Sequence, residues 1–391
     1  MAPALLTGCG TSAPASDAAV RSIQRTLDAR AAAVLAGDER GYLAAVAPGA
    51  ERLRAEESRR FRGLARVPFG SWEYRLGAVD RRGDRAVAGA ELRYRVSGYD
   101  KGPVTAARTL ELVREGDRWY VTADRVAEGG AEQLWEQGEV TVVRGKRSLI
   151  LGVGQEPARL EALAVTADRS VPAVTAAWPS RWAGRVVILV PSTLEDMGAL
   201  LGAPASGYRG IAAVTTGETG GSGESPADRV IVNPAAYGVL GEFGKEVVLT
   251  HETTHVATRA HTSPATPMWL SEGYADWVAY RATDRTAPQT APELRREVRR
   301  GALPAELPSD GDFAFGGTPQ ELARAYEGGW LACELIAEEW GERRLAEFYR
   351  VVGAGEHRGA AVEKAMSDIL STTPRAFTTR WRTYLAHRLG G

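Results

Sequence analysis

The segment Val247–His261 has the sequence VVLTHETTHVATRAH. It contains His251, Glu252 and His255 in the pattern HExxH. On a helix, side chains four positions apart lie on one face, so the two imidazoles project side by side and can bind one metal ion. Glu252 directly follows the first ligand and can reach a water on that ion. Two nitrogen ligands, an open coordination position and a nearby carboxylate are typical of a zinc hydrolase.

A five-residue pattern also arises by chance, and two histidines at this spacing can lie on the surface of an ordinary amphipathic helix. The apolar residues that flank the motif, Phe243 and Val247–Leu249 before it and Val256 after it, predict a helix that is buried on one side. A third ligand decides between these alternatives, and the sequence offers two candidates.

The first candidate is Glu272, in the segment Met268–Trp277 with the sequence MWLSEGYADW. Here the chain resembles the gluzincin metallopeptidases, which include the thermolysin and aminopeptidase N families and in which a second helix carries a glutamate ligand in a similar setting. The resemblance implies that His251, His255 and Glu272 bind Zn²⁺. The 16 residues between His255 and Glu272 suffice to end one helix and begin another.

The second candidate is His261, which follows His255 by six residues, the spacing of the metzincin family. That family has a glycine three residues after its second histidine, where the chain turns with a positive φ. This chain has Thr258 there, and a β-branched residue resists such a conformation. The sequence therefore favours Glu272, and it predicts that His261 lies in a solvated loop, with a substrate contact as the alternative.

The same resemblance implies roles for two further side chains. Asp276 lies four residues after Glu272, and in thermolysin-like enzymes an aspartate at this offset accepts a hydrogen bond from a ligand histidine; the alternative is a surface carboxylate. Tyr326, in the segment AYEGGWL, matches the tyrosine of the Y-E-K-G segment of the aminopeptidase N family, which stabilises the oxyanion. Gly328 replaces the lysine of that segment, and the alternative for Tyr326 is a core residue.

The composition is that of an ordinary globular protein with enough residues for two or three domains. The 391 residues are 44% hydrophobic and 25% charged. A formal net charge of −1, without a block of like charges, argues against nucleic acid as a partner. The sequence predicts no membrane-spanning segment, because it contains no run of 18 apolar residues. The two cysteines, Cys9 and Cys333, offer no disulfide framework.

The stretch Ala4–Cys9, ALLTGC, resembles the end of a bacterial lipoprotein signal, in which the cysteine becomes the lipidated first residue. The resemblance implies an extracytoplasmic protein that is attached to the cell membrane only by a lipid anchor at Cys9. Residues 1–16 would then be the remnant of the signal and a flexible tether. The alternative is a short tail with a chance cysteine.

Residues 17–126 predict a first domain of the α+β class. Helical periodicity in Ala18–Leu35 and Arg52–Leu64, with a short helix at Leu43–Val46 between them, gives way to strand-like alternation from Trp72 to Val121. Helices followed by an antiparallel meander resemble the cone-shaped nuclear-transport-factor-two-like fold. Such a domain binds a ligand or a partner, or serves as a spacer, and the sequence favours the spacer. Residues 127–140 are predicted to be a linker.

Residues 141–391 are predicted to form the metallopeptidase domain. Apolar runs at Ser148–Val153 and Val186–Val190 predict strands of a small mixed sheet, and Gly210–Thr215 is the candidate edge strand for pairing with an extended substrate. After Asp276 the apolar spacing is helical to the end. The helices expected there are Gln320–Glu338, Gly341–Val352, Gly359–Leu370 and Pro374–Arg388.

The sequence as a whole predicts an α+β protein: a cone-shaped domain, then a zincin domain with a small mixed sheet and a mostly helical C-terminal half. It predicts a lipid-anchored zinc peptidase that acts on peptides or proteins, with Glu252 as general base and Tyr326 as oxyanion stabiliser. The aminopeptidase segment G-A-M-E-N is missing, which favours endopeptidase action. The alternative is a catalytically silent ligand- or protein-binding lipoprotein on a peptidase fold.

Overall fold

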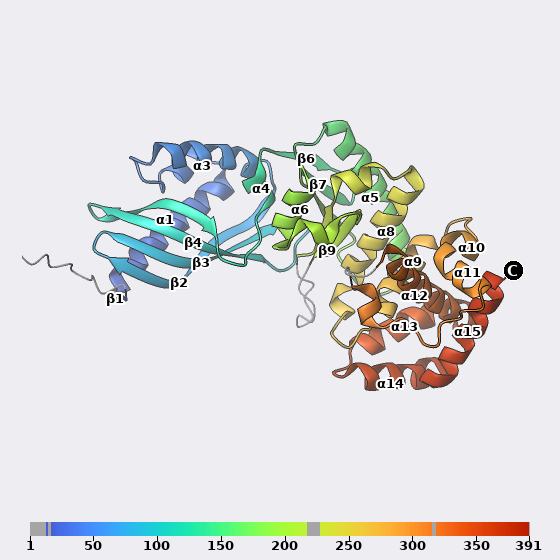
Figure 1. The fold of residues 1–391 in the computed structure, drawn as a ribbon. Coiled ribbons are helices and arrows are strands. Elements are labelled where there is room, and N and C mark those ends of the chain that lie inside the picture. The colour runs from blue at the N-terminus through green and yellow to red at the C-terminus, as the bar shows by residue number, and fades with distance from the viewer. Residues whose placement is uncertain (1–12, 15–16, 217–226, 315–317, 391) are drawn as a thin grey trace, which may run out of the picture. The chain divides into compact units, whose positions relative to one another are not determined.

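The computed structural model describes residues 13–14, 17–216, 227–314 and 318–390. Two compact units make up the chain: one runs to Thr141 and includes Ala199–Ala203, and the other comprises Val142–Gly198 and Pro204–Gly391. The predicted α+β class is confirmed, with an antiparallel sheet in the first unit and a small mixed sheet followed by helices in the second (Figure 1). The predicted anchor at Cys9 lies outside the described residues.

The first unit is a meander of antiparallel strands in the order β1-β2-β3-β4-β5. Two of its hairpins turn at Gly83 and Gly116, whose φ values of 62° and 61° are positive, as their place in tight turns requires. Helix α1 packs against β2 and β5. The strands are β1 (Ala13–Pro14), β2 (Phe69–Arg82), β3 (Arg85–Val96), β4 (Val104–Glu115) and β5 (Arg118–Val126). The helices are α1 (Asp17–Ala36), α2 (Glu39–Leu43), α3 (Glu51–Leu64) and α4 (Leu134–Gln137).

One short helix of this unit lies earlier than the sequence predicted. Helix α2 ends at Leu43, and Val46, which was expected to be helical, instead forms a parallel bridge with Val121 of β5. The side chain of Asp38 accepts a hydrogen bond from the amide of Gly41 at 3.0 Å and so begins the helix at Glu39. Ala45 and Val46 are buried where this segment pairs with β5: the amide of Ala47 donates to the carbonyl of Val121, and the amide of Val121 donates to the carbonyl of Ala45.

The sheet of the second unit has the order β6-β7-β8-β10-β9. Strand β8 runs parallel to both β7 and β10, and β9 pairs antiparallel with β10, so the sheet is mixed as predicted. Strand β9 ends this order and is shorter than the predicted Gly210–Thr215, because Gly210 has a φ of +86° and lies outside the strand. The strands are β6 (Val140–Arg144), β7 (Ser148–Val153), β8 (Val186–Val190), β9 (Ala213–Thr216) and β10 (Arg229–Val232).

Helix α5 (Pro157–Ala177) and strand β6 were not predicted from the sequence. Pro172 lies inside α5, and the many alanines of this helix give it only a weak apolar stripe. The helix nevertheless buries Leu160, Leu163 and Val171 in one core with the sheet and with Leu249 of helix α8 (Glu242–Thr258). This core fixes α8 against the sheet.

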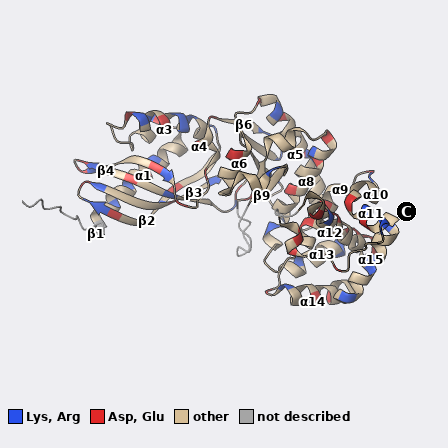
Figure 2. Ribbon diagram, in the orientation of Figure 1, with Lys and Arg blue, Asp and Glu red and all other residues tan. Residues whose placement is uncertain are grey.

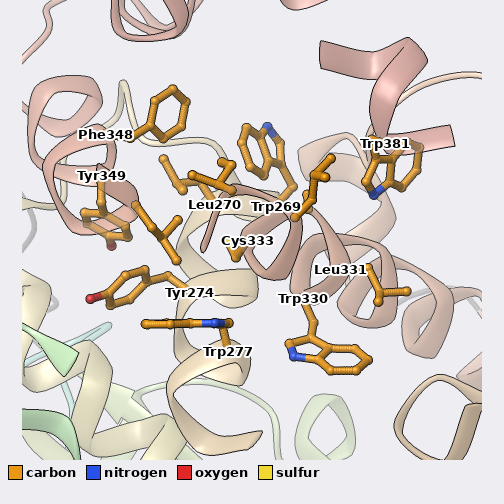
Figure 3. Packing of buried hydrophobic residues seen from close by; sticks show 14 of the residues in the cluster. Trp269, Leu270, Tyr274, Trp277, Trp330, Leu331, Cys333, Phe348, Tyr349 and Trp381 are labelled. Carbon is orange, nitrogen blue, oxygen red and sulfur yellow. The ribbon is translucent and has the colours of Figure 1, made fainter. Parts of the chain in front are cut away.

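The remainder of the second unit is helical and has its own core (Figure 3). Trp269, Leu270 and Tyr274 of α9 pack there against Leu331 and Cys333 of α12, and the side chain of Cys333 is fully buried. The helices are α6 (Leu194–Leu201), α7 (Pro234–Gly238), α9 (Met268–Tyr280), α10 (Ala287–Thr290), α11 (Pro292–Arg299), α12 (Pro319–Trp340), α13 (Glu342–Gly353), α14 (Arg358–Leu370) and α15 (Pro374–Gly390), with 3₁₀ turns at Ala205–Tyr208, Arg259–His261 and Asp310–Phe313.

Charged residues of both signs are interspersed over the helices and strands of each unit (Figure 2). In the part of the chain that the structure describes, no helix is both long and apolar enough to cross a membrane.

Candidate metal centre

Helix α8 presents the HExxH motif from a backbone that is anchored on its opposite side. Leu249 is fully buried in the core beneath the sheet, and Thr250 and Thr254 are buried as well. This burial leaves His251 and His255 on the partly open face of the helix, one turn apart. The predicted burial is confirmed at Leu249 and Val256, but Phe243, which was expected to belong to the buried side, is exposed.

Three ligand atoms converge at this face of α8. His251 Nε2 lies 3.0 Å from His255 Nε2 and 3.2 Å from Glu272 Oε2, and His255 Nε2 lies 3.4 Å from the same carboxylate oxygen. Glu272 is contributed by α9, which packs against α8. Among the described residues, these three form the one group of histidine, cysteine and acidic side chains whose ligand atoms cluster closely enough to hold a metal ion.

The spacing of these atoms fits a tetrahedral zinc site. Ligands about 2.0–2.2 Å from a central ion are about 3.3–3.6 Å apart at the corners of a tetrahedron, close to the separations observed here. Two imidazole nitrogens and one carboxylate oxygen are also the donor set of many catalytic zinc sites, in which a fourth position remains open.

The hydrogen bonding of His251 supports the same interpretation. Its Nδ1 lies 2.7 Å from Asp276 Oδ1, where the ring N–H donates to the carboxylate. In the neutral imidazole this leaves Nε2 with a lone pair, and that lone pair points at Glu272 Oε2, which is also an acceptor. A cation between the two acceptors, or a proton on the ring, resolves this conflict. Asp276, four residues after Glu272, thus contacts His251 directly.

The carboxylates and imidazoles of the cluster shift one another's pKa values. Burial lowers the pKa of His251, but the carboxylates of Asp276 and Glu272 outweigh burial and hold that pKa well above its usual value. Burial raises the pKa of Glu272, and the two imidazoles outweigh it and hold the pKa far below its usual range. A bound divalent cation would provide the positive charge that protons on the rings otherwise provide.

Glu252 is held by a residue from the sheet. Thr215 Oγ1, on the edge strand β9, lies 2.6 Å from Glu252 Oε2 and 3.1 Å from the backbone carbonyl oxygen of Glu252. From the sequence, Thr215 is predicted only as the last residue of a candidate edge strand, and this contact is not predicted. The contact joins residues 37 positions apart, and no local spacing in the sequence indicates it.

Tyr326 of α12 lies near the imidazole of His251. Its ring centroid is 6.2 Å from that of His251 and 5.2 Å from that of Phe313. Burial raises the pKa of the Tyr326 phenol well above its usual value, and the carboxylates of Glu272 and Asp276 raise it further. The hydroxyl therefore keeps its proton and is available as a hydrogen-bond donor.

Two glycines bring Glu272 and Tyr326 together. Helices α9 and α12 cross so closely that a Cβ added at Gly273 would lie 2.2 Å from the carbonyl oxygen of Gly329, and one at Gly329 would lie 2.7 Å from the carbonyl oxygen of Trp269. Only glycine permits two backbones to approach this closely. The glycine after Glu272 and the second glycine after Tyr326 are therefore structural requirements of the site.

His261 is not part of the cluster. It ends the 3₁₀ turn after α8, and its ring packs edge-on against Trp178 with centroids 5.6 Å apart. The expectation of a solvated loop histidine is wrong in part: the side chain is half-buried, and burial lowers its pKa. Gly353 explains this packing, because a Cβ there would overlap the carbonyl oxygen of His261, so the turn lies directly against α13.

The chain matches no protein-family model and no curated protein. Among solved structures it is similar to native yeast LTA4 hydrolase, with a TM-score of 0.37 and 13% sequence identity. The alignment covers 70% of this chain and 43% of that one, so the chain spans less than half the length of the yeast protein. A likeness this distant assigns no function.

Proposed function

We propose that the protein is a zinc-dependent peptidase of the gluzincin type. The observation that carries this proposal is the convergence of His251 Nε2, His255 Nε2 and Glu272 Oε2, with separations of 3.0–3.4 Å, beside an oriented Glu252. A zinc ion held by these three atoms would polarise the scissile carbonyl and acidify a water molecule.

Each remaining residue has a role that follows from its surroundings. The Glu252 carboxylate accepts the proton of the attacking water and passes it to the leaving amine. The Tyr326 hydroxyl donates a hydrogen bond to the oxygen that becomes negatively charged as the carbonyl is attacked. Asp276 accepts the Nδ1–H of His251 and so keeps the other ring nitrogen directed at the ion.

The position of β9 favours an extended peptide as substrate. The strand ends the sheet order, and Thr215 on this strand contacts Glu252. A peptide that added a further strand to this edge would pass close to the general base. The substrate class is therefore peptide or protein, and pairing along the chain favours endopeptidase action.

The experiment begins with metal content. The purified protein is expected to contain about one zinc per chain, and Glu272→Gln is expected to lose it because the third ligand is weakened. His261→Ala is the matched control, and its zinc content is expected to equal that of the wild type. Loss of zinc from His261→Ala with retention in Glu272→Gln would contradict the assigned ligand set and favour the metzincin arrangement.

The second measurement is cleavage of a mixed peptide library, with and without a chelator. Glu252→Gln is expected to keep its zinc and to lose activity by about 10²–10⁴-fold, the usual contribution of a general base. If the wild type and Glu252→Gln both bind zinc and are equally inert, catalysis is excluded. The alternative of a silent binding protein on a peptidase fold would then be favoured.

We also propose that the protein is extracytoplasmic and anchored by lipid at Cys9, as the ALLTGC segment suggests. The test is radiolabelled palmitate incorporation by the expressed full chain. The wild type is expected to carry label in the membrane fraction, and Cys9→Ser is expected to carry none. Equal labelling of the two proteins would refute the anchor.

A further inference from the structure

Thr215 contacts the carboxylate to which the proposed function assigns the proton transfer, although it lies on a different element. Its hydroxyl oxygen is 2.6 Å from Glu252 Oε2 and 3.1 Å from the Glu252 carbonyl oxygen. A threonine hydroxyl has one hydrogen, and both of these atoms are acceptors, so Thr215 is the donor and the carboxylate accepts. A hydrogen bond to a charged acceptor at this distance is a strong one.

The contact engages only one of the two carboxylate oxygens. Among the described residues, Glu252 Oε1 has no hydrogen-bond partner in this structure, while Oε2 is held by Thr215. A glutamate side chain has three rotatable bonds, and fixing one oxygen removes most of its freedom to turn. The second oxygen then stays directed at one place, as a base requires when it must face a single water.

The strand that carries Thr215 is itself fixed. Its backbone is paired with Val230 of β10, whose side chain is fully buried in the core that also anchors α8. A β-branched residue suits this position, because its χ1 is restricted and the hydroxyl keeps its direction. Thr215 therefore fixes the Glu252 side chain of helix α8 relative to the sheet.

We infer that Thr215 is a positioning residue that orients the Glu252 carboxylate. Because Thr215 lies on the edge strand, it would also hold this carboxylate in a fixed position relative to a peptide paired with that strand. The inference rests on the proposed function, because it presumes that Glu252 is the base. Thr215 acts through Glu252 and does not itself exchange a proton with the substrate.

The test compares variants that separate the hydroxyl from the shape of the side chain. Thr215→Val removes the hydroxyl at nearly constant volume, and Thr215→Ser keeps the hydroxyl. Thr175→Val is the matched control, because that exposed threonine bonds only to the Val171 carbonyl of its own helix, at 2.8 Å. The assays are zinc content, kcat and KM on one peptide that the wild type cleaves.

Thr215→Val is expected to retain zinc and KM within about twofold and to lose kcat by about 10- to 100-fold, the effect of a misplaced catalytic group. Thr215→Ser is expected to recover kcat to within a few fold, and Thr175→Val to match the wild type. In a Glu252→Gln background, adding Thr215→Val is expected to cause no further loss, because the two residues act as a unit.

Three kinetic results would overturn the inference: an unchanged kcat in Thr215→Val, an equal loss in Thr215→Ser, or a full additional loss in the Glu252→Gln background. Crystal structures of the zinc-loaded wild type and of Thr215→Val give a readout that does not require turnover. The Glu252 carboxylate is expected to bond to Thr215 in the first and to turn away in the second. If the wild type and Glu252→Gln are equally inert, the proposed function fails. An unchanged Glu252 orientation in Thr215→Val refutes the positioning role.

Discussion

Each unit of the molecule buries a cluster of charged side chains, and the two clusters differ in how their charge is balanced. In the first unit, Arg30 Nη2 lies 2.6 Å from Glu57, and Arg108 Nη2 lies 2.8 Å from Asp124 and 2.7 Å from Glu136. Arginines and carboxylates are present in equal number there, and guanidinium groups lower the pKa of Asp124 against the effect of burial. The members are Arg30, Arg60, Arg108, Glu57, Asp124 and Glu136.

In the second unit, the buried carboxylates face imidazoles. Among the described residues, the ion pairs of Glu272 and Asp276 are with His251 and His255 alone. Arg259, one turn beyond His255, bonds to Asp228 at 2.8 Å and so does not compensate the cluster. The first cluster balances its own charge, whereas in the second the donor atoms of His251, His255 and Glu272 converge with no arginine or lysine paired to them among the described residues. This difference supports the proposed metal site.

The largest effect on stability is expected from breaking the balanced cluster. Arg30→Met leaves Glu57 and Asp124 with one guanidinium fewer at a site where both are fully buried. Loss of one partner of a buried ion pair costs about 3–5 kcal/mol, so denaturant unfolding should report a loss of that size. Below its unfolding transition, Arg30→Met should keep the zinc content of the wild type.

The matched double variant Arg30→Met/Glu57→Gln sharpens this prediction. Removing the charge of Glu57 as well removes part of the uncompensated burial, so the double variant should be more stable than the sum of its single changes. A change in unfolding free energy below about 1 kcal/mol for Arg30→Met would show that Arg60 and Arg108 suffice without it.

A smaller loss of stability is expected when the close crossing of helices α9 and α12 beside the proposed metal site is changed. In Gly273→Ala the new Cβ would overlap the Gly329 carbonyl, a backbone atom that moves only if helix α12 moves. Overpacking of this kind costs about 1–3 kcal/mol. Because Glu272 and Tyr326 flank this crossing, kcat should fall together with the melting temperature.

Gly359→Ala is the control for this prediction, because its added Cβ has no neighbour within contact distance on helix α14. Its melting temperature and kcat should both stay at the wild-type values. Wild-type behaviour of Gly273→Ala would show that the helices separate freely and that the close crossing does not position the site.

The features of the site that the sequence could predict are those carried by local spacing. His251 and His255 are four residues apart, and Asp276 is four residues after Glu272, so each pair shares a helix face without reference to the rest of the fold. Whether Glu272 or His261 joins the imidazoles depends on how two helices pack. The sequence could favour Glu272 only through a family resemblance and the β-branched Thr258.

The features that the sequence could not predict depend on contacts between distant residues. The Thr215–Glu252 hydrogen bond joins a strand to a helix, and the Arg30–Asp124 pair joins residues at opposite ends of the first unit. The crossing at Gly273 becomes visible only when Gly329 is placed against it. Helix α5 was missed because its amphipathic pattern is weak, and tertiary packing decides its structure.

Zinc affinity is expected to fall less when Asp276, which contacts the proposed ligand His251, is changed than when a proposed ligand itself is changed. Asp276→Asn keeps the shape of the side chain but removes the charge that faces His251 Nδ1 at 2.7 Å. Such changes weaken metal binding by about 10- to 100-fold, which competition with a zinc indicator would measure. Glu334→Gln, which changes a carboxylate bonded to Tyr384 and away from the cluster, should leave the affinity unchanged.

Glu327 is a third kind of buried carboxylate, because its partners are uncharged. It accepts hydrogen bonds from the backbone amides of Glu293 at 3.1 Å and Leu294 at 2.5 Å, at the start of helix α11. Burial raises its pKa to about 7, although these two donors lower it. Glu327, whose hydrogen-bond partners are backbone amides, is therefore predicted to make stability depend on pH in the neutral range.

The direction of this pH dependence follows from the protons that the folded and unfolded protein bind. Between pH 4.5, the ordinary pKa of a glutamate, and about pH 7, the folded protein holds a proton on Glu327 that the unfolded chain has released. Stability should therefore fall as pH rises through this window, by on the order of 2 kcal/mol. Glu327→Gln should flatten this slope in urea unfolding measured at about pH 5 and about pH 7.5.

The exposed Glu321, whose pKa is lowered by its cap with Thr318, titrates below the window, so Glu321→Gln should keep the wild-type slope. An equal slope in Glu327→Gln and the wild type would mean that its two amide donors offset burial completely.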